Sequence, residues 1–187
     1  MKVKITCFVL VLITALFTGC GQKTGNTDNE TGNTNGNATP DVVTTASIVN
    51  TEEAFLNAIS AEGTWIIAVT QDLTISKDLL LEGEFKNGKK DDKGNDVIQR
   101  KLALYAQDES RNITARYTLT APKLTVTSPE ASIQHGTFKG DLYVSVANFQ
   151  LVDATVDGNV YFTTEEAKNT FTMDETSKIT GTQELKK

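Results

Sequence analysis

The sequence predicts an all-β fold: a single-stranded right-handed parallel β-helix, or β-solenoid, with rungs of about 18 residues and a short N-terminal capping helix. The main evidence is an internal repeat. Residues 136–144, GTFKGDLYV, recur 18 positions later as residues 154–162, ATVDGNVYF, with apolar, polar and glycine positions kept in kind. The same offset aligns residues 124–126 with residues 142–144, so three successive turns of chain share one pattern. Residues 47–187 are expected to form one domain, by length.

Residues 1–19 are predicted to be an export signal. Lys2 and Lys4 precede an uncharged run over residues 5–17, which is too short to span a membrane as a mature helix. The next residues, Thr18-Gly19-Cys20, resemble the lipobox of bacterial lipoproteins, although Phe17 stands where that family usually has leucine. The resemblance implies that Cys20 receives a diacylglycerol and that cleavage makes it the first residue of the mature chain. The alternative is an ordinary secretory signal with an incidental cysteine.

Cysteine usage favours lipidation. Cys7 lies inside the predicted signal, so Cys20 would be the only cysteine left after cleavage, and no disulfide could form within one mature chain. A single acyl chain holds a protein to a membrane only marginally, whereas two anchor it stably, and lipoprotein maturation implies at least two. We therefore expect a cell-membrane location, anchored through lipid on the extracytoplasmic face.

Residues 20–46 are predicted to be a tether without stable structure. They consist mainly of Gly, Asn, Thr, Asp and Lys and offer too little apolar surface to offset the entropy of ordering. Cleavage after residue 19 would remove two of the 18 basic residues and none of the 24 acidic ones, leaving a net charge of −8. An acidic exported domain is a poor partner for nucleic acid and for anionic lipid, so the lipid anchor must hold it at the membrane.

The folded part is expected to open with a helix over residues 51–61. Asn50, followed three residues later by Glu53, resembles a capping box, and Gly63 is a plausible stop. Phe55, Ala58 and Ile59 would share the buried face. Short apolar strands are predicted to follow over residues 65–69, 73–75 and 79–81. The helix would then cover the open end of the stacked strands.

This helix-then-strand opening resembles the start of right-handed parallel β-helices of the pectin-lyase-like class. The later Gly-x-x-x-Gly-Asp-Leu and Ala-x-x-x-Gly-Asn-Val segments resemble the short rungs of bactofilins, which are polymer-forming solenoids. A left-handed helix of hexapeptides would also give a period of 18, but it requires an aliphatic residue at every sixth position. Counting from Leu142, those positions hold Asn148 and Ala154, which favours the right-handed form.

Side-chain alternation predicts an outward-facing column of Thr125, Tyr143 and Tyr161, because Leu142 and Val144 would point inward. Stacked aromatic rings offer a flat platform to sugar rings, so this column is the candidate ligand face. The alternative is a structural ladder that only stiffens the sheet. The same register predicts two polar ladders, one pairing Lys139 with Asp157 and the other formed by Lys123, Asp141 and Asn159.

One candidate catalytic group is Tyr117, His135 and Asp153, which the 18-residue offset places on three successive rungs. An imidazole between a phenol and a carboxylate could transfer a proton, but a lone histidine at a corner is usually only solvated, so no catalytic residue is assigned. Residues 86–96 are predicted to form a projecting charged hairpin. Its three acids, Asp91, Asp92 and Asp96, lack the spacing of a calcium loop, so neither a metal nor another cofactor is expected.

After Phe162 the period breaks, with a bulge over residues 163–168, and resumes at an offset of 22 or 23 around Phe171 and Ile179. The charged tail, residues 183–187, discourages end-to-end stacking, so we expect a monomer. Together these features predict a membrane-anchored lipoprotein without enzymatic activity, whose β-helix is a binding or structural module at the cell envelope, with polysaccharide or a protein as partner. The alternatives are a lyase-like or hydrolase-like enzyme acting on polysaccharide and a self-assembling envelope scaffold.

Overall fold

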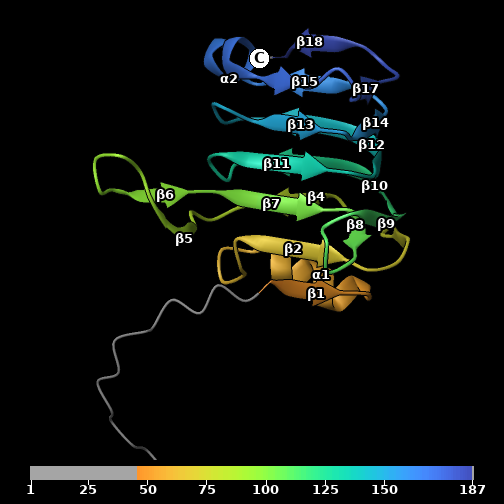
Figure 1. Ribbon diagram of the computed structural model, residues 1–187. Helices are drawn as coiled ribbons and strands as arrows, with labels where there is room; N and C mark the ends of the chain where they lie inside the picture. Colours follow the sequence, from red (N-terminus) through yellow and green to blue (C-terminus); the bar gives the residue numbers. More distant parts are fainter. Residues whose placement is uncertain (1–45, 187) are drawn as a thin grey trace, which may run out of the picture. The chain divides into compact units, whose positions relative to one another are not determined.

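The computed structural model describes residues 46–186, which form an all-β unit built mainly from parallel strands. One sheet has six strands in the order β1-β2-β7-β11-β13-β16, all parallel. Strands β1, β2, β7, β11 and β13 lie one above another in Figure 1. Their bounds are Ser47–Val49, Ile66–Val69, Arg100–Ala103, Ala131–Gln134, Gln150–Val152 and Thr172–Met173. The predicted signal, Cys20 and nearly all of the predicted tether lie outside the described residues.

The second sheet has eight strands and is also parallel. It is built around the long strands β10 (Thr118–Val126) and β12 (Thr137–Val144), each of which bends so that two shorter strands pair with it on one side. The shorter strands are β3 (Leu73–Thr74), β4 (Leu79–Leu81), β14 (Thr155–Asp157), β15 (Val160–Phe162), β17 (Lys178–Ile179) and β18 (Gln183–Leu185). From β2 onward the chain passes back and forth between the two sheets, so neighbours within a sheet are separated in sequence by strands of the other, whereas β1 and β2 are separated by a helix.

The pairing register confirms the repeat read from the sequence. Strand β12 pairs with β14 and β15 at an offset of 18 residues, and so do residues 123–126 of β10 with residues 141–144 of β12. Upstream of a register shift between Thr120 and Lys123, however, the offset between β10 and β12 is 19 residues. The extra residue lies at Ala121-Pro122, where proline has no N–H to donate to a ladder, as is common at bulges.

The last turn of chain is longer, as predicted, with offsets of 22 residues between β13 and β16 and 23 residues between β14 and β17. The extra residues form a helix, α2 (Glu165–Thr170), where the sequence predicts a bulge over residues 163–168; the insertion is confirmed, and its helical form was not predicted. Thr164 is its N-cap and accepts a hydrogen bond from the Ala167 N–H, and Ala167 is buried against the core.

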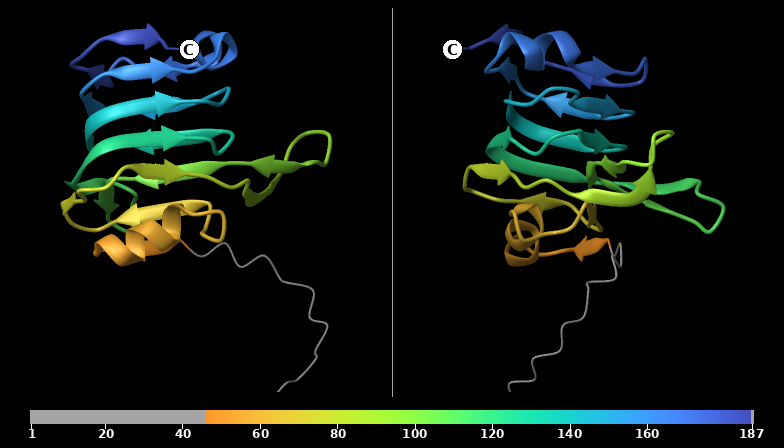
Figure 2. Two further views of the ribbon diagram at one scale, coloured as in Figure 1. Left: turned by 180° about the vertical axis from the view of Figure 1, so that it is seen from behind. Right: turned by 90° about the vertical axis from the view of Figure 1, so that its left-hand side faces the viewer.

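The N-terminal helix is confirmed as α1 (Glu52–Ile59), and Phe55, Ala58 and Ile59 are its buried residues. Its N-cap is Thr51, whose hydroxyl accepts from the Ala54 N–H, rather than Asn50. The helix contacts β1, β2 and β4 at the β1 end of the stack, as Figure 2 shows. Strand β1 itself has no sequence signal strong enough to predict it, because only three residues pair.

Between the two sheets lies one apolar core, to which nearly every strand contributes an inward-facing side chain. Its largest fully buried apolar side chains are Phe55, Ile67, Ile75, Leu79, Leu81, Leu102, Leu104, Leu119, Phe138, Phe149 and Phe162. Arg100 is also fully buried: its Nη2 donates to the carbonyls of Ala58 (2.7 Å) and Ser60 (3.1 Å), at the C-terminal end of α1. The guanidinium lies 3.7 Å from the centre of the Phe85 ring.

The predicted hairpin is confirmed: β5 (Lys86–Lys90) and β6 (Asp96–Ile98) pair antiparallel and project from the stack in Figure 1. Asp91 closes its turn by accepting from the backbone N–H groups of Lys93 and Asn95. Asp96 binds the ammonium groups of Lys86 (2.8 Å) and Lys90 (2.6 Å), which lowers its pKa to about 2. A second antiparallel hairpin, which the sequence did not indicate, joins β8 (Tyr105–Gln107) to β9 (Ile113–Arg116).

Candidate functional site

The first candidate site is the tyrosine column on the outer face of the eight-stranded sheet. The register aligns Thr125 with Tyr143 and Tyr143 with Tyr161, as the repeat predicts. The two rings have centroids 4.8 Å apart and planes tilted by 42°. Leu80, 43% exposed, and Glu184 extend the column at its two ends. The column therefore runs along the stacking direction, across five strands.

The tyrosine rings are half-buried rather than fully exposed, because each packs on its neighbour and Lys186 crosses them. The Lys186 ammonium lies 4.4 Å from the centre of the Tyr161 ring and 5.6 Å from that of Tyr143. It also donates a hydrogen bond of 3.2 Å to the Tyr143 hydroxyl, which raises the pKa of Lys186. Sequence reasoning predicted only a charged tail here; the cation–π contact depends on the path of β18, which no motif marks.

The polar ladders beside the tyrosines follow the predicted register, but one of them is paired differently. Asp141 Oδ1 accepts from the side chain of Asn159 at 3.0 Å, as the ladder predicts. The Lys123 ammonium, in contrast, binds Asp78 Oδ2 at 2.6 Å, on the side away from Asp141, and this contact raises the pKa of Lys123. Lys139 faces Asp157 with 3.9 Å between Nζ and Oδ2, which is too long for a hydrogen bond.

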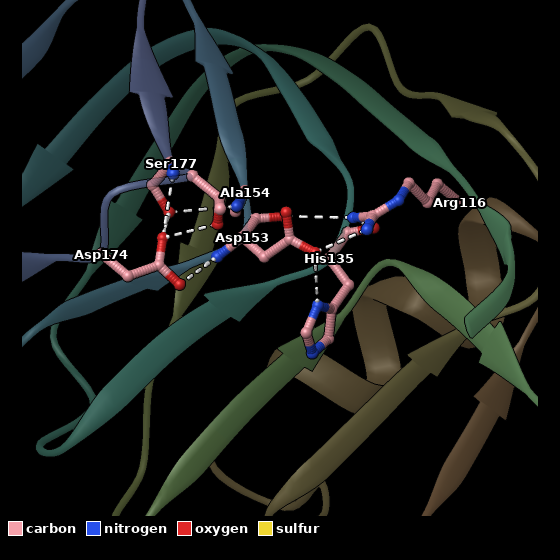
Figure 3. Close-up of polar contacts among 7 residues, drawn as sticks. Arg116, His135, Asp153, Ala154, Asp174 and Ser177 are labelled. Carbon is pink, nitrogen blue, oxygen red and sulfur yellow. Dashed lines mark hydrogen bonds and ion pairs between the residues drawn. The ribbon is translucent and has the colours of Figure 1, made fainter. Parts of the chain in front are cut away.

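The second candidate site is a polar cluster at a corner of the stack, around His135 and Asp153 (Figure 3). His135 Nδ1 lies 3.0 Å from Asp153 Oδ2, so the predicted contact between these two residues is confirmed. The third member is Arg116 rather than Tyr117: Arg116 Nη2 binds the same Asp153 oxygen at 2.5 Å. The reason is the 19-residue offset upstream of Pro122, which brings Arg116 and not Tyr117 beside His135.

The cluster ties successive turns together. Arg116 Nη1 donates to the carbonyl of His135 at 3.0 Å and, more weakly, to that of Asp153 at 3.3 Å. Both of those residues have left-handed backbones, with φ of 60° and 48°, a conformation that costs about 1 kcal/mol or more for a residue other than glycine. The His135 ring also meets Tyr105 edge-on at 4.6 Å. These contacts hold two strained corners in place.

The next turn continues the cluster through Asp174, also shown in Figure 3. Asp174 Oδ2 accepts from the Asp153 N–H, and its Oδ1 accepts from the hydroxyl of Ser177 at 2.7 Å. The Ser177 oxygen in turn accepts from the Ala154 N–H. The Ser177 hydroxyl therefore already donates to Asp174 and accepts from Ala154, and it does not contact His135. These hydrogen bonds join the corner residues of successive turns to one another.

Within residues 46–186, no group of three or more His, Cys, Asp or Glu side chains is arranged to hold a metal ion. In the same part of the chain, no helix is long and apolar enough to cross a membrane. No family model, curated protein or solved structure matches this chain.

Replacing Asp153 with asparagine is expected to remove part of the acid sensitivity of the fold. His135 first, and then Arg116, holds the pKa of Asp153 below its usual value. Because the folded pKa lies below the unfolded one, the ionised carboxylate stabilises the fold above about pH 4, and this contribution is lost as the pH falls through the folded pKa. The difference in Tm between wild type and Asp153→Asn should therefore shrink between about pH 6 and pH 3. An equal difference at both pH values would contradict this role.

Proposed function

We propose that this chain is a lipid-anchored extracytoplasmic protein whose domain is a single-stranded right-handed parallel β-helix that binds carbohydrate on its tyrosine face. The parallel sheets support the β-helix, because the chain passes from one to the other and the neighbouring strands between β10 and β15 keep an offset of 18 or 19 residues. The lipobox-like Thr18-Gly19-Cys20 supports the anchor, with Cys20 as the lipidated residue. The domain would act as a monomer without cofactor or enzymatic activity.

The observation that carries the binding function is the stacked pair Tyr143 and Tyr161. Aromatic rings bind through their faces, and a half-buried tyrosine keeps an apolar body beside a hydroxyl that can donate or accept a hydrogen bond. Two rings on neighbouring strands offer two such faces along one line. This combination suits sugar rings, which have apolar faces and polar edges.

The Lys186 ammonium supports the same function, because it lies over both rings and would be displaced by, or hydrogen-bonded to, a ligand that covers them. The acidic chain, with a formal net charge of −6, makes nucleic acid an unsuitable partner for the face. An enzyme acting on polysaccharide and a self-assembling scaffold are the competing functions.

The test is a glycan array probed with the purified full-length protein and with the Tyr143→Ala/Tyr161→Ala double variant. We expect wild type to bind a subset of glycans and the double variant to lose that binding, because truncating central aromatic contacts typically costs about 2 kcal/mol or more each. Tyr105→Ala is the matched control, since this half-buried tyrosine lies on the other sheet's side against His135 and should leave glycan binding unchanged. Wild-type binding that survives in the double variant would overturn the assignment of the face. Turnover of a bound glycan would favour an enzyme acting on polysaccharide. Sedimentation as a large assembly in the absence of ligand would favour a self-assembling scaffold.

A further inference from the structure

An open groove of about 600 Å³ lies beside the tyrosine column. Its lining includes Asp141, which precedes Tyr143 by two residues on β12 and faces the same way, so the groove edge and the ring are about 7 Å apart along the strand. The lining residues come from four successive turns of chain: residues 75–76, 120–122, 139–141 and 157–158. The groove therefore crosses the strands and runs along the stacking direction, parallel to the tyrosine column.

Glycines line the groove where successive turns of chain approach each other closely. Strand β12 bends at Gly140, whose φ of +143° is rarely open to other residues. A Cβ at Gly140 would lie 1.9 Å from the carbonyl oxygen of Ala121, and one at Gly158 would lie 2.1 Å from that of Gly140. Each bend thus sits directly on the backbone of the turn before it.

Both rims of the groove carry charged side chains. On one rim, Lys139 and Asp157 face each other at 3.9 Å, so neither satisfies the other by a hydrogen bond. On the other rim lies Asp141. One oxygen of each carboxylate accepts a hydrogen bond within the domain, Asp141 Oδ1 from Asn159 and Asp157 Oδ1 from Thr180, so the remaining capacity lies with the Oδ2 atoms and the Lys139 ammonium. Between them, the exposed ring of Pro122 and the buried Ala121 give an apolar surface. Donors, acceptors and apolar contacts are therefore found together along the groove.

The charged residues around the groove and the tyrosine column determine whether a charged or an uncharged ligand would bind there. Three lysines face four carboxylates there, and Lys123 is neutralised directly by Asp78 at 2.6 Å. A polyanion would find no cluster of free cations to replace its hydration, whereas uncharged hydroxyl groups can bond to both ammonium and carboxylate. The seven residues are Lys123, Lys139, Lys186, Asp78, Asp141, Asp157 and Glu184.

We propose that this groove binds an uncharged linear glycan that runs parallel to the stacking direction of the strands. On the side of the groove next to the tyrosine column, the sugar rings would pack on the faces of Tyr143 and Tyr161. This inference rests on the proposed carbohydrate-binding function and adds the path and the charge class of the ligand. Four turns at a spacing of about 4.8 Å give a channel roughly 14 Å long, longer than one sugar ring, so affinity should rise with chain length beyond a disaccharide.

The experiment is a titration of the full-length protein with cello-oligosaccharides and chito-oligosaccharides of increasing length, and with oligogalacturonates as the anionic comparison. Ser76 is an exposed residue of the groove lining, so Ser76→Trp should fill the channel without disturbing the core. We expect Ser76→Trp and Lys139→Ala each to lower the affinity for a neutral oligosaccharide at least about tenfold, with an unchanged Tm. Ser110→Trp, at the exposed end of the β8–β9 hairpin, is the control and should bind like wild type.

The possible failures are distinguishable. Binding that is lost in Tyr143→Ala/Tyr161→Ala but kept in both groove variants would overturn the groove and leave the tyrosine platform standing. Preference for oligogalacturonates would overturn the uncharged class alone. Failure of wild type to bind any of the three series, together with an array that shows no bound glycan, would overturn both proposals.

Discussion

Gly158→Ala is expected to lower the free energy of unfolding by more than about 3 kcal/mol, although it adds a single methyl group. The new Cβ would lie 2.1 Å from the carbonyl oxygen and 2.7 Å from the carbonyl carbon of Gly140. Both atoms belong to the backbone, so no side chain can rotate away. The neighbouring turn is fixed as well, because the Leu142 N–H donates to the Asn159 carbonyl at 2.8 Å. The clash can therefore be relieved only if the two turns move apart, which would break the backbone hydrogen bonds between β12 and its partner strands.

The measurement is the urea midpoint of unfolding, with Gly94→Ala as the matched control. A Cβ at Gly94 meets nothing within 4 Å, and only its φ of +84° opposes the change. The control should therefore lose no more than about 1 to 2 kcal/mol. Equal losses in the two variants would show that the close approach of the turns is not what makes Gly158 necessary.

Arg100→Ala is expected to cost about 3 to 5 kcal/mol, comparable with the removal of a large core side chain. The variant would leave a cavity where a fully buried side chain lies between α1 and the Phe85 ring. It would also remove the Arg100 donor from the carbonyls of Ala58 and Ser60 at the end of the helix, of which only Ser60 keeps another donor, the Gly63 N–H. The cap and the first turn of the stack should loosen together.

Burial lowers the pKa of Arg100 to about 10, so the guanidinium is still charged at neutral pH and is attracted to the carbonyl end of the helix. Its Nε and Nη1 have no hydrogen-bond partner, so part of the charge is uncompensated. Arg100→Met fills most of the volume and removes that unpaired charge, and it should therefore lose less stability than Arg100→Ala. Hydrogen exchange of the α1 amides, alongside denaturation, checks the account. An alanine variant as stable as wild type would contradict it.

The part of the fold that is readable from the sequence is the part in which identical turns stack. Phe138 aligns with Val156 and Leu142 with Val160 because each inward position must meet another apolar residue in the next turn. The tyrosine column is readable for the same reason, because the outward positions share that register. The register is set by the core, and the core is visible as a repeat.

What the sequence could not give depends on local departures from that repeat. The single additional residue at Ala121-Pro122 changes which side chain reaches His135, and an offset taken from the later turns therefore selects Tyr117 instead of Arg116. The helix at Glu165–Thr170 is too short for a periodicity signal, although its Thr164 cap could have marked it. The groove lies beside the bend at Gly140, and the sequence shows the spacing of the glycines there but not the bend itself.

The most direct test of the tyrosine platform is titration calorimetry of the best glycan found on the array. Wild type would be compared with the Tyr143→Phe/Tyr161→Phe and Tyr143→Ala/Tyr161→Ala variants of the full-length protein. If the ring faces bind the sugar, the phenylalanine variant should stay within about tenfold of wild type, and the alanine variant should lose at least about 30-fold at an unchanged Tm. An alanine variant that binds as tightly as wild type would contradict the account and leave the stacked tyrosines a structural ladder.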